Sequence, residues 1–125
     1  MTETIKILIA DDNELMRLLM KRLFSKCLVS PNISETKDLP DTINYLKEEI
    51  IDFLLLDINM PQGDSDPGTI KEILAIQPDI KICMFSGNDK AVLEQGFLDA
   101  GAVGFIQKDE NMGDSLQQVI KSVFN

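Results

Sequence analysis

The sequence predicts a single α/β domain in which a parallel β-sheet is covered by helices on both faces. Segments with strand character alternate five times with segments of helical apolar spacing, an order typical of parallel sheets with crossover helices. One strand segment, 53–56, is apolar without alternation, as strands buried on both faces are. No repeat, linker or low-complexity tract interrupts this order. We therefore expect one domain over residues 1–125, with right-handed crossovers.

The first strand–helix unit is well marked. Residues 5–10 form a β-branched apolar run that suits an interior strand, and Asn13 can cap the following helix, with Glu14 in its first turn. We expect this helix to turn apolar side chains toward the core. Four leucines form the expected stripe and four further side chains widen it: Leu15, Leu18, Leu19 and Leu23, then Met16, Met20, Phe24 and Cys27.

The second unit is less distinct. Pro31 and Asn32 end the helical pattern, and residues 33–36 form only a short, weak strand candidate. Pro40 suits the first turn of a second helix. The side chains expected to face inward from this helix are Ile43, Leu46 and, at its end, Ile50.

The third unit begins with the fully apolar strand. This strand runs into Asp57 and is stopped at Pro61, because proline cannot donate a ladder hydrogen bond. A loop over 62–68 follows, with two glycines, a proline and two aspartates. Since it lacks apolar residues, we expect this loop to be solvated and mobile. The third helix is marked by Ile70, Ile73 and Leu74.

The last two units complete the alternation. Residues 80–85 and 102–106 predict the fourth and fifth strands, and the helix between them covers 90–100. Gly96 weakens that helix by ~1 kcal/mol relative to alanine. Its expected core contacts are Val92, Leu93 and Phe97. The final helix has the clearest apolar stripe, made of Met112, Leu116, Val119, Ile120 and Val123.

Composition narrows the range of functions. Twelve basic and twenty-one acidic residues give a net charge of −9, which argues against direct binding of nucleic acid and favours a cation site or a basic protein partner. The absence of histidine excludes histidine-based catalysis and most zinc sites. Cys27 and Cys83 form no CxxC pair, so we expect reduced core residues. No apolar run approaches the ~20 residues of a membrane span. We therefore expect a cytoplasmic protein without a membrane partner.

Polar side chains follow four of the five predicted strands. Asp11 and Asp12 follow the first, Asp57 ends the third, Ser86 follows the fourth, and Lys108 comes just after the fifth. Because the carboxyl ends of parallel strands share one edge of the sheet, we expect these five residues to meet in one crevice. Taken singly, each also has an ordinary explanation as a cap, a turn residue or a solvated charge.

Together the five residues predict phosphoryl transfer. Three carboxylates without a cation would repel one another, so we expect a hard divalent ion between them. Mg²⁺ suits the crevice because it takes one or two carboxylates and keeps several waters. Lys108 and Ser86 would supply a positive charge and a hydroxyl donor for an incoming anion. A cation, an ammonium and a donor around a carboxylate are the groups needed to transfer a phosphoryl group to that carboxylate.

The chain resembles a response-regulator receiver domain of two-component signalling, related to the chemotaxis regulators. Four motifs at the strand ends carry the resemblance: IADDN at 9–13, LLDINMP at 55–61, FSG at 85–87 and GFIQK at 104–108. The acid pair, the acceptor aspartate, the serine and the lysine match in order, and the resemblance covers nearly the whole chain. It implies a flavodoxin-like (βα)5 doubly wound sandwich, with a five-stranded parallel sheet in the order 2-1-3-4-5.

This resemblance implies a role for each acidic residue. Asp57 would accept a phosphoryl group from a sensor histidine kinase or a histidine phosphotransfer protein. Asp12 and Asp57 would bind Mg²⁺ directly, Asp11 through water, and Asn59 through its backbone carbonyl. The domain would catalyse only its own phosphorylation and dephosphorylation, so we expect a signalling phosphoacceptor and not an enzyme in the usual sense.

The resemblance also implies how the signal leaves the site. Ser86 would donate a hydrogen bond to the phosphoryl group, and Lys108 would pair with it. Phe105 matches the family's aromatic switch, although its position in a strand is equally well explained by an ordinary core phenylalanine. The switch would alter the face made by the fourth helix, fifth strand and fifth helix. That face would bind a downstream target protein or an output domain, and the chain either works alone or belongs to a longer regulator.

The chain departs from the family pattern at three places. Asp109 stands where the family usually has proline after the lysine, so we expect a looser loop around Lys108. The loop at 62–68 carries a few extra residues, and segment 33–39 lacks the usual glycine-containing turn. None of these departures removes a catalytic group.

Three other interpretations fit parts of the pattern. A haloacid-dehalogenase-type phosphatase would have a second aspartate two residues after the first, where this chain has Asn59. A flavodoxin-like carrier would need a phosphate loop after the first strand, where Asp11 and Asp12 would repel phosphate. The alternative that stays open is a non-phosphorylated pseudo-receiver acting as a protein-interaction module. Such domains typically lose the acid pair, the acceptor or the lysine, all of which this chain keeps.

Overall fold

Five parallel strands form one sheet in the computed structural model, which describes residues 4–87 and 90–124. The strands are β1 (Lys6–Ala10), β2 (Asn32–Thr36), β3 (Phe53–Asp57), β4 (Lys81–Ser86) and β5 (Gly104–Gln107). They lie in the order β2-β1-β3-β4-β5, and every neighbouring pair is parallel. The predicted α/β fold class is confirmed, including the strand order.

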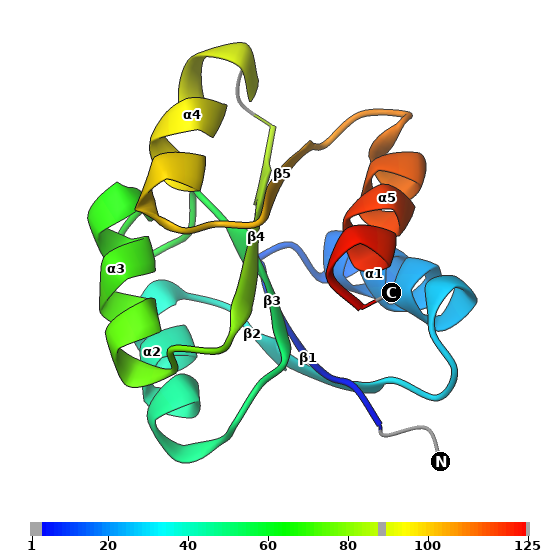
Figure 1. Ribbon diagram of the computed structural model, residues 1–125, viewed down its shortest axis with the longest axis horizontal. Helices are drawn as coiled ribbons and strands as arrows, with labels where there is room; N and C mark the ends of the chain where they lie inside the picture. Colours follow the sequence, from blue (N-terminus) through cyan, green and yellow to red (C-terminus); the bar gives the residue numbers. More distant parts are fainter. Residues whose placement is uncertain (1–3, 88–89, 125) are drawn as a thin grey trace.

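Helices cover both faces of the sheet (Figure 1). On one face lie α1 (Glu14–Cys27) and α5 (Met112–Phe124), and on the other lie α2 (Leu39–Glu48), α3 (Pro67–Ile76) and α4 (Lys90–Ala100). Each layer of helices encloses its own hydrophobic core against the sheet. Within the described ranges, no helix has both the length and the apolar character needed to cross a membrane.

Two predicted helix starts are confirmed. Asn13 caps α1, where its side-chain Oδ1 accepts the N–H of Met16 at 3.0 Å. Pro40 lies in the first turn of α2, behind the N-cap Asp38. The short strand candidate at 33–36 is also present, as β2.

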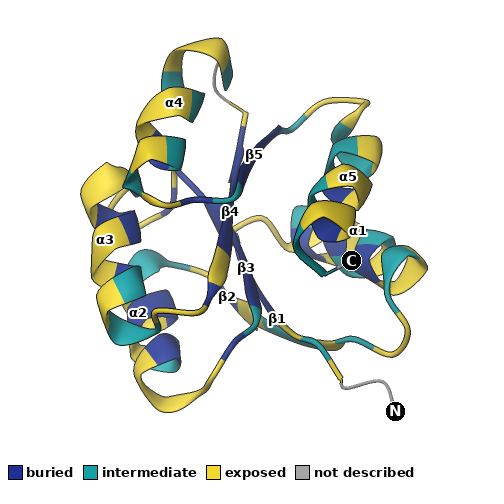
Figure 2. Ribbon diagram, in the orientation of Figure 1, coloured by how far each residue is buried: buried dark blue, intermediate teal, exposed yellow. Residues whose placement is uncertain are grey.

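Strand β3 is the centre of the sheet and of both cores. All five of its residues are buried. Leu54 and Leu56 pack on the α2–α4 side, whereas Phe53 and Leu55 pack on the α1–α5 side, because successive strand side chains point to opposite faces. A shift of one residue in register would exchange the two sets. Figure 2 shows this buried sheet between helices with exposed outer faces. Packing on both sides therefore fixes where Asp57, at the strand end, must lie.

The predicted core face of α1 is wrong in part. Leu15, Leu18 and Leu19 are exposed by 73%, 42% and 38%. Met20 and Phe24, which were predicted to face the core, are buried, and Arg17 is buried beside them. Leucines lie on several sides of this helix, so apolar spacing alone does not select the face that packs on the sheet.

Two other apolar residues expected in the core are exposed. Ile50 is 74% exposed because α2 ends at Glu48, and its neighbour Ile51 turns inward instead. Val92 is 74% exposed on α4, where Phe97 is the buried residue. Ile50 is therefore exposed because it follows the helix, and Val92 because it lies on the side of α4 that faces away from the sheet.

Both cysteines are free thiols. Cys83 is fully buried, and Cys27 is partly buried against the same core between the sheet and the α1–α5 layer. Burial raises the pKa of each thiol, so both stay protonated at neutral pH. The predicted core position is confirmed for Cys83, and Cys27 packs at the edge of the same core.

The loop at 62–68 is solvent-exposed as expected, except at Ser65, where it folds back onto the end of β3. Ser65 is buried, and its N–H donates to the carbonyl of Ile58 at 2.8 Å. Asp66 forms a capping box at the start of α3 with Thr69. In this box Asp66 Oδ1 accepts the N–H of Thr69 at 3.0 Å, and Thr69 Oγ1 accepts the N–H of Asp66 at 3.1 Å. Backbone and capping bonds therefore order a loop that has no apolar residue.

Replacing the N-cap of α3 should destabilise the fold. We expect Asp66→Ala to lower the free energy of unfolding by about 1 kcal/mol, because the first turn of α3 loses its side-chain acceptor. Asp64→Ala removes an exposed acid two residues earlier and is the matched control, with an expected change below about 0.5 kcal/mol. Urea denaturation followed by circular dichroism measures both. Equal losses in the two variants would contradict the capping role.

Candidate functional site

Three carboxylates meet at the carboxyl edge of the sheet. Asp11 follows β1 and is fully buried, Asp12 beside it is exposed, and Asp57 is the last residue of β3 and is buried. The strands β1 and β3 are neighbours, so their ends bring these side chains together. One carboxylate oxygen from each residue lies within 4.8 Å of the others. The structure thus assembles the acid cluster that sequence spacing predicts.

Lys108 enters this cluster from the end of β5. Its Nζ lies 3.0 Å from Asp11 Oδ2 and 3.3 Å from Asp57 Oδ2. The same ammonium lies 4.9 Å from the centre of the Phe85 ring, within the range of a cation–π contact. The backbone N–H of Lys108 donates to the carbonyl of Ser86 at 2.8 Å. One ammonium therefore bridges two carboxylates, while its own backbone continues the pairing of β4 with β5.

The Asp57 carboxyl has an unusual affinity for its proton. Burial raises the pKa of Asp57 to about 6; the Lys108 charge opposes this rise, and the negative charge of Asp11 adds to it. The N–H of Asn59 donates to Asp57 Oδ1 only at 3.4 Å. Lys108 therefore offsets the cost of burying the Asp57 charge only in part.

The acid cluster fits a divalent cation. Asp11 Oδ2 is buried, and among the described residues it accepts no hydrogen bond of good geometry. It does form an ion pair with the Lys108 ammonium. Three carboxylates offer more negative charge than one ammonium compensates. Carboxylate oxygens are the ligands that Mg²⁺ prefers, and exposed Asp12 leaves an open side for the waters that this ion keeps.

Ser86 and Phe105 lie on the two strands next to this cluster. Ser86 is the last residue of β4, is fully buried, and pairs in register with Gln107 of β5. Phe105 is 3% exposed, and its ring centre lies 6.1 Å from that of Phe97 on α4. Phe105 therefore packs inward against α4, which is compatible both with a core role and with a switch role.

The turn after Lys108 is closed by hydrogen bonds. Asp109 Oδ1 accepts the N–H of Asn111 at 2.8 Å, and the Asp109 carbonyl accepts the N–H of Met112 at 3.2 Å. These bonds lead the chain into α5. The aspartate that replaces proline thus forms its own local turn, and the expectation of a looser loop is not supported.

Sequence reasoning missed one residue at this edge, Arg17. It is 6% exposed, and its Nη1 donates to the backbone carbonyl of Asp11 at 2.8 Å. The signal was available: Arg17 lies three residues before Met20 and seven before Phe24, on the buried side of the helix. A charged residue in such a stripe indicates a specific buried partner.

Asp57→Asn is expected to stabilise the metal-free protein at pH 7.5. The carboxyl has its ordinary pKa of 3.8 in the unfolded chain and about 6 in the folded protein, so stability falls as the pH rises through this window. The neutral amide avoids this fall in folding stability, which amounts to at most ~3 kcal/mol. Thermal melts in EDTA should show a larger gain at pH 7.5 than at pH 4.5. Asp79→Asn, at an exposed site, is the control, and a gain independent of pH would contradict the assignment.

The chain has clear relatives in sequence. It matches the response regulator receiver domain model over residues 7–121. The glycerol metabolism activator of Pseudomonas putida is 32% identical over 120 residues, which cover 92% of this chain and 53% of that protein. The chain thus spans about half the length of the curated relatives it matches.

Solved structures share the fold. A CheY-like response regulator receiver domain protein from Methanospirillum hungatei superposes with a TM-score of 0.82 at 20% identity, over 97% of this chain and 94% of that chain. A response regulator from Burkholderia pseudomallei, solved with a phosphorylated aspartic acid, calcium ion and citrate, gives a TM-score of 0.77 at 16% identity, over 97% and 66%. Sequence match, strand order and acid cluster agree, and the chain belongs to the response regulator receiver domain family.

Proposed function

We propose that this chain is a phosphoacceptor domain in which Asp57 takes a phosphoryl group from the phosphohistidine of a sensor kinase or a histidine phosphotransfer protein. The place of Asp57 carries the proposal: at the end of the central strand, its carboxylate lies 3.3 Å from the Lys108 ammonium and inside the acid cluster. An Asp57 oxygen would attack phosphorus, the bond from phosphorus to the imidazole nitrogen would break, and an acyl phosphate would form.

Asp57 suits the acceptor role better than its two neighbours. Asp11 is fully buried, its Oδ1 accepts the N–H of Asn13 at 2.8 Å, and its Oδ2 pairs with Lys108. Asp12 is exposed, and the ion pairs of Lys108 are with Asp11 and Asp57. Since the pKa of Asp57 is about 6, its carboxylate is ionised at neutral pH and more basic than an ordinary aspartate, which favours nucleophilic attack.

The acid cluster would hold Mg²⁺ beside the acceptor. We assign Asp12 and Asp57 as direct ligands, Asp11 as a ligand through water, and Asn59 as a ligand through its backbone carbonyl. Bound there, the ion supplies positive charge for the phosphoryl oxygens. The phosphorylated aspartic acid and calcium ion named for the Burkholderia protein support a divalent cation beside a phosphoaspartate in this fold.

Ser86 and Lys108 would hold the transferred group. Lys108 already pairs with Asp57, so its ammonium can follow the negative charge from the carboxylate to the phosphoryl oxygens. Ser86 lies at the end of the adjacent strand, where its hydroxyl would donate to one of those oxygens. The chain's own residues would catalyse both phosphorylation and loss of the phosphoryl group.

The signal would leave through the α4–β5–α5 face. Phe105 packs on Phe97 of α4, and the Gln107 side chain accepts the backbone N–H of Lys90, the first residue of α4, at 3.3 Å. Both contacts come from the strand that leads into Lys108. A movement of Lys108 would therefore shift β5 and alter its contacts with α4, with Phe105 as the switch residue.

The partners on that face belong to the same proposal. They would be a downstream target protein or an output domain, reached in the cytoplasm without direct contact to nucleic acid or membrane. The net charge of −9 favours a basic protein surface as the partner. A pseudo-receiver that binds partners without phosphorylation is the alternative, and the chain's complete set of acids, serine and lysine favours the active domain.

The phosphoacceptor is tested with acetyl phosphate and Mg²⁺. We expect the wild type to gain the mass of one phosphoryl group, and Asp57→Asn to gain none, because the amide oxygen is a poor nucleophile. Intact-mass spectrometry measures the gain. Asp64→Asn, at an exposed site on the neighbouring loop, is the matched control and should be labelled like the wild type. Equal labelling of Asp57→Asn at another residue would reject the assignment.

A further inference from the structure

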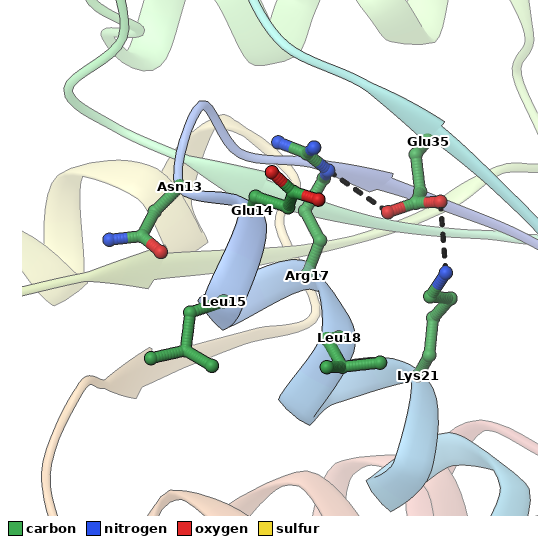
Figure 3. Close-up of a pocket in the computed structure, with 7 residues that line it drawn as sticks. All are labelled: Asn13, Glu14, Leu15, Arg17, Leu18, Lys21 and Glu35. Carbon is green, nitrogen blue, oxygen red and sulfur yellow. Dashed lines mark hydrogen bonds and ion pairs between the residues drawn. The ribbon is translucent and has the colours of Figure 1, made fainter.

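A buried arginine contacts the backbone of the acid pair at the end of β1. Arg17 belongs to α1, and Figure 3 shows its guanidinium pointing toward Glu35 of β2 in a pocket close to the end of β1. Its side chain is 8% exposed, whereas Lys21, one turn further along the helix, is 38% exposed. The side chain therefore lies inside the protein, where a charge persists only if it is paired.

The guanidinium of Arg17 joins three elements. Its Nε donates to Glu35 Oε1 at 2.9 Å, and its Nη1 donates to the backbone carbonyl of Asp11 at 2.8 Å. The helix α1, the strand β2 and the end of β1 are thus tied at one point. A guanidinium can make both bonds at once because its donors form a rigid planar fork, which the single ammonium of lysine does not offer.

The accepting carbonyl belongs to the peptide group between Asp11 and Asp12. The rest of Asp11 is also held: its N–H donates to the carbonyl of Thr36 at 3.1 Å, and its Oδ1 accepts the N–H of Asn13 at 2.8 Å. Those two bonds fix the start of Asp11 and its side chain. The bond from Arg17 fixes the plane of the following peptide, and this plane sets the direction in which Asp12 leaves the strand.

Glu35 holds the arginine in place. Its Oε1 accepts from Arg17 and its Oε2 from Lys21 at 3.1 Å. Burial of Glu35 disfavours its charge, but the hydrogen bonds and charges of Lys21 and Arg17 outweigh burial and lower the pKa of this carboxyl. Glu35 is therefore ionised at neutral pH, and its negative charge lies against the Arg17 guanidinium on the β2 side.

We propose that Arg17, held by Glu35, is a positioning residue that fixes the Asp11–Asp12 peptide so that both carboxylates converge on the divalent cation of the proposed phosphoacceptor site. The inference rests on the proposed function, because the cation belongs to it. Arg17 acts through the backbone and does not touch the cation. Loss of a group that orients metal ligands typically weakens metal binding by roughly 10- to 100-fold.

A purely structural role is the competing explanation. Arg17 also ties α1 to β2, so its loss would lower stability whether or not it positions the acids. Lys21 separates the two effects, because its ammonium contacts Glu35 and leaves the bond from Arg17 to Asp11 in place. Lys21→Met is therefore the matched control for Arg17→Met.

The test titrates Mg²⁺ alone into the full chain, without a phosphoryl donor, at a temperature well below the Tm of each variant. Isothermal calorimetry gives the Kd, and amide NMR gives the position of the Asp12 resonance before metal is added. We expect Arg17→Met to shift that metal-free resonance and to raise the Kd by roughly 10-fold or more. Lys21→Met should leave the Kd within about twofold of the wild type.

Two conservative variants keep the test decisive if Arg17→Met folds poorly. Arg17→Lys keeps the positive charge but cannot make both hydrogen bonds of the guanidinium. Glu35→Gln keeps an oxygen that can accept from Arg17 but removes the negative charge of Glu35. Both should weaken Mg²⁺ binding, Glu35→Gln by less. Wild-type affinity in every folded Arg17 variant would overturn the positioning role alone. Absence of Mg²⁺ binding by the wild type would overturn the proposed function with it.

Discussion

The ion pairs of Lys108 with Asp11 and Asp57 are the interaction on which the rest of the site depends. Two carboxylates are buried at adjacent strand ends, and a positive charge between them offsets part of the cost of burying their negative charge. Lys108 provides that charge from β5, on the far side of β4. The compensation is incomplete, since the pKa of Asp57 remains raised to about 6. The site is thus built with excess negative charge, a condition that a cation would relieve and that a phosphoryl group would rearrange.

The sheet positions the side chains of Asp11, Asp57 and Lys108 next to one another. β3 is buried on both faces, so its register cannot slip without turning apolar side chains toward the wrong core. Asp57 pairs with Phe85 in that register, and the ring of Phe85 lies under the Lys108 ammonium. The same strand ends lead outward to α4 through Phe105 and Gln107. A short chain of contacts therefore connects the buried strand β3, the charged site at its end and α4.

The sequence predicted those features that depend on strand ends and the buried faces of α2, α3 and α5, and it was wrong in part about the buried face of α1. The apolar run before Asp57 and the polar residues after four of the five strands led to the fold and the acid cluster, because parallel strands share an edge. On α1, Leu15 and Leu18 imitate a core stripe but face solvent, while Arg17 is buried. Its partners Glu35 and the Asp11 carbonyl come from other strands, so no local pattern reveals them. The burial of Ser65 was not predicted either, because it accompanies a backbone hydrogen bond to Ile58, which is seven residues earlier in the chain.

The central claim is that the charge at Asp57 is connected through Lys108 to the α4–β5–α5 face, and amide NMR with beryllofluoride and Mg²⁺ tests it most directly. This phosphoryl mimic should shift the resonances of Asp57 and Lys108, and with them those of Phe105 and Phe97, while Asp57→Asn should show no such change. Shifts confined to the strand-end residues 11–13 and 57–59, with β5 and α4 unmoved, would contradict the account.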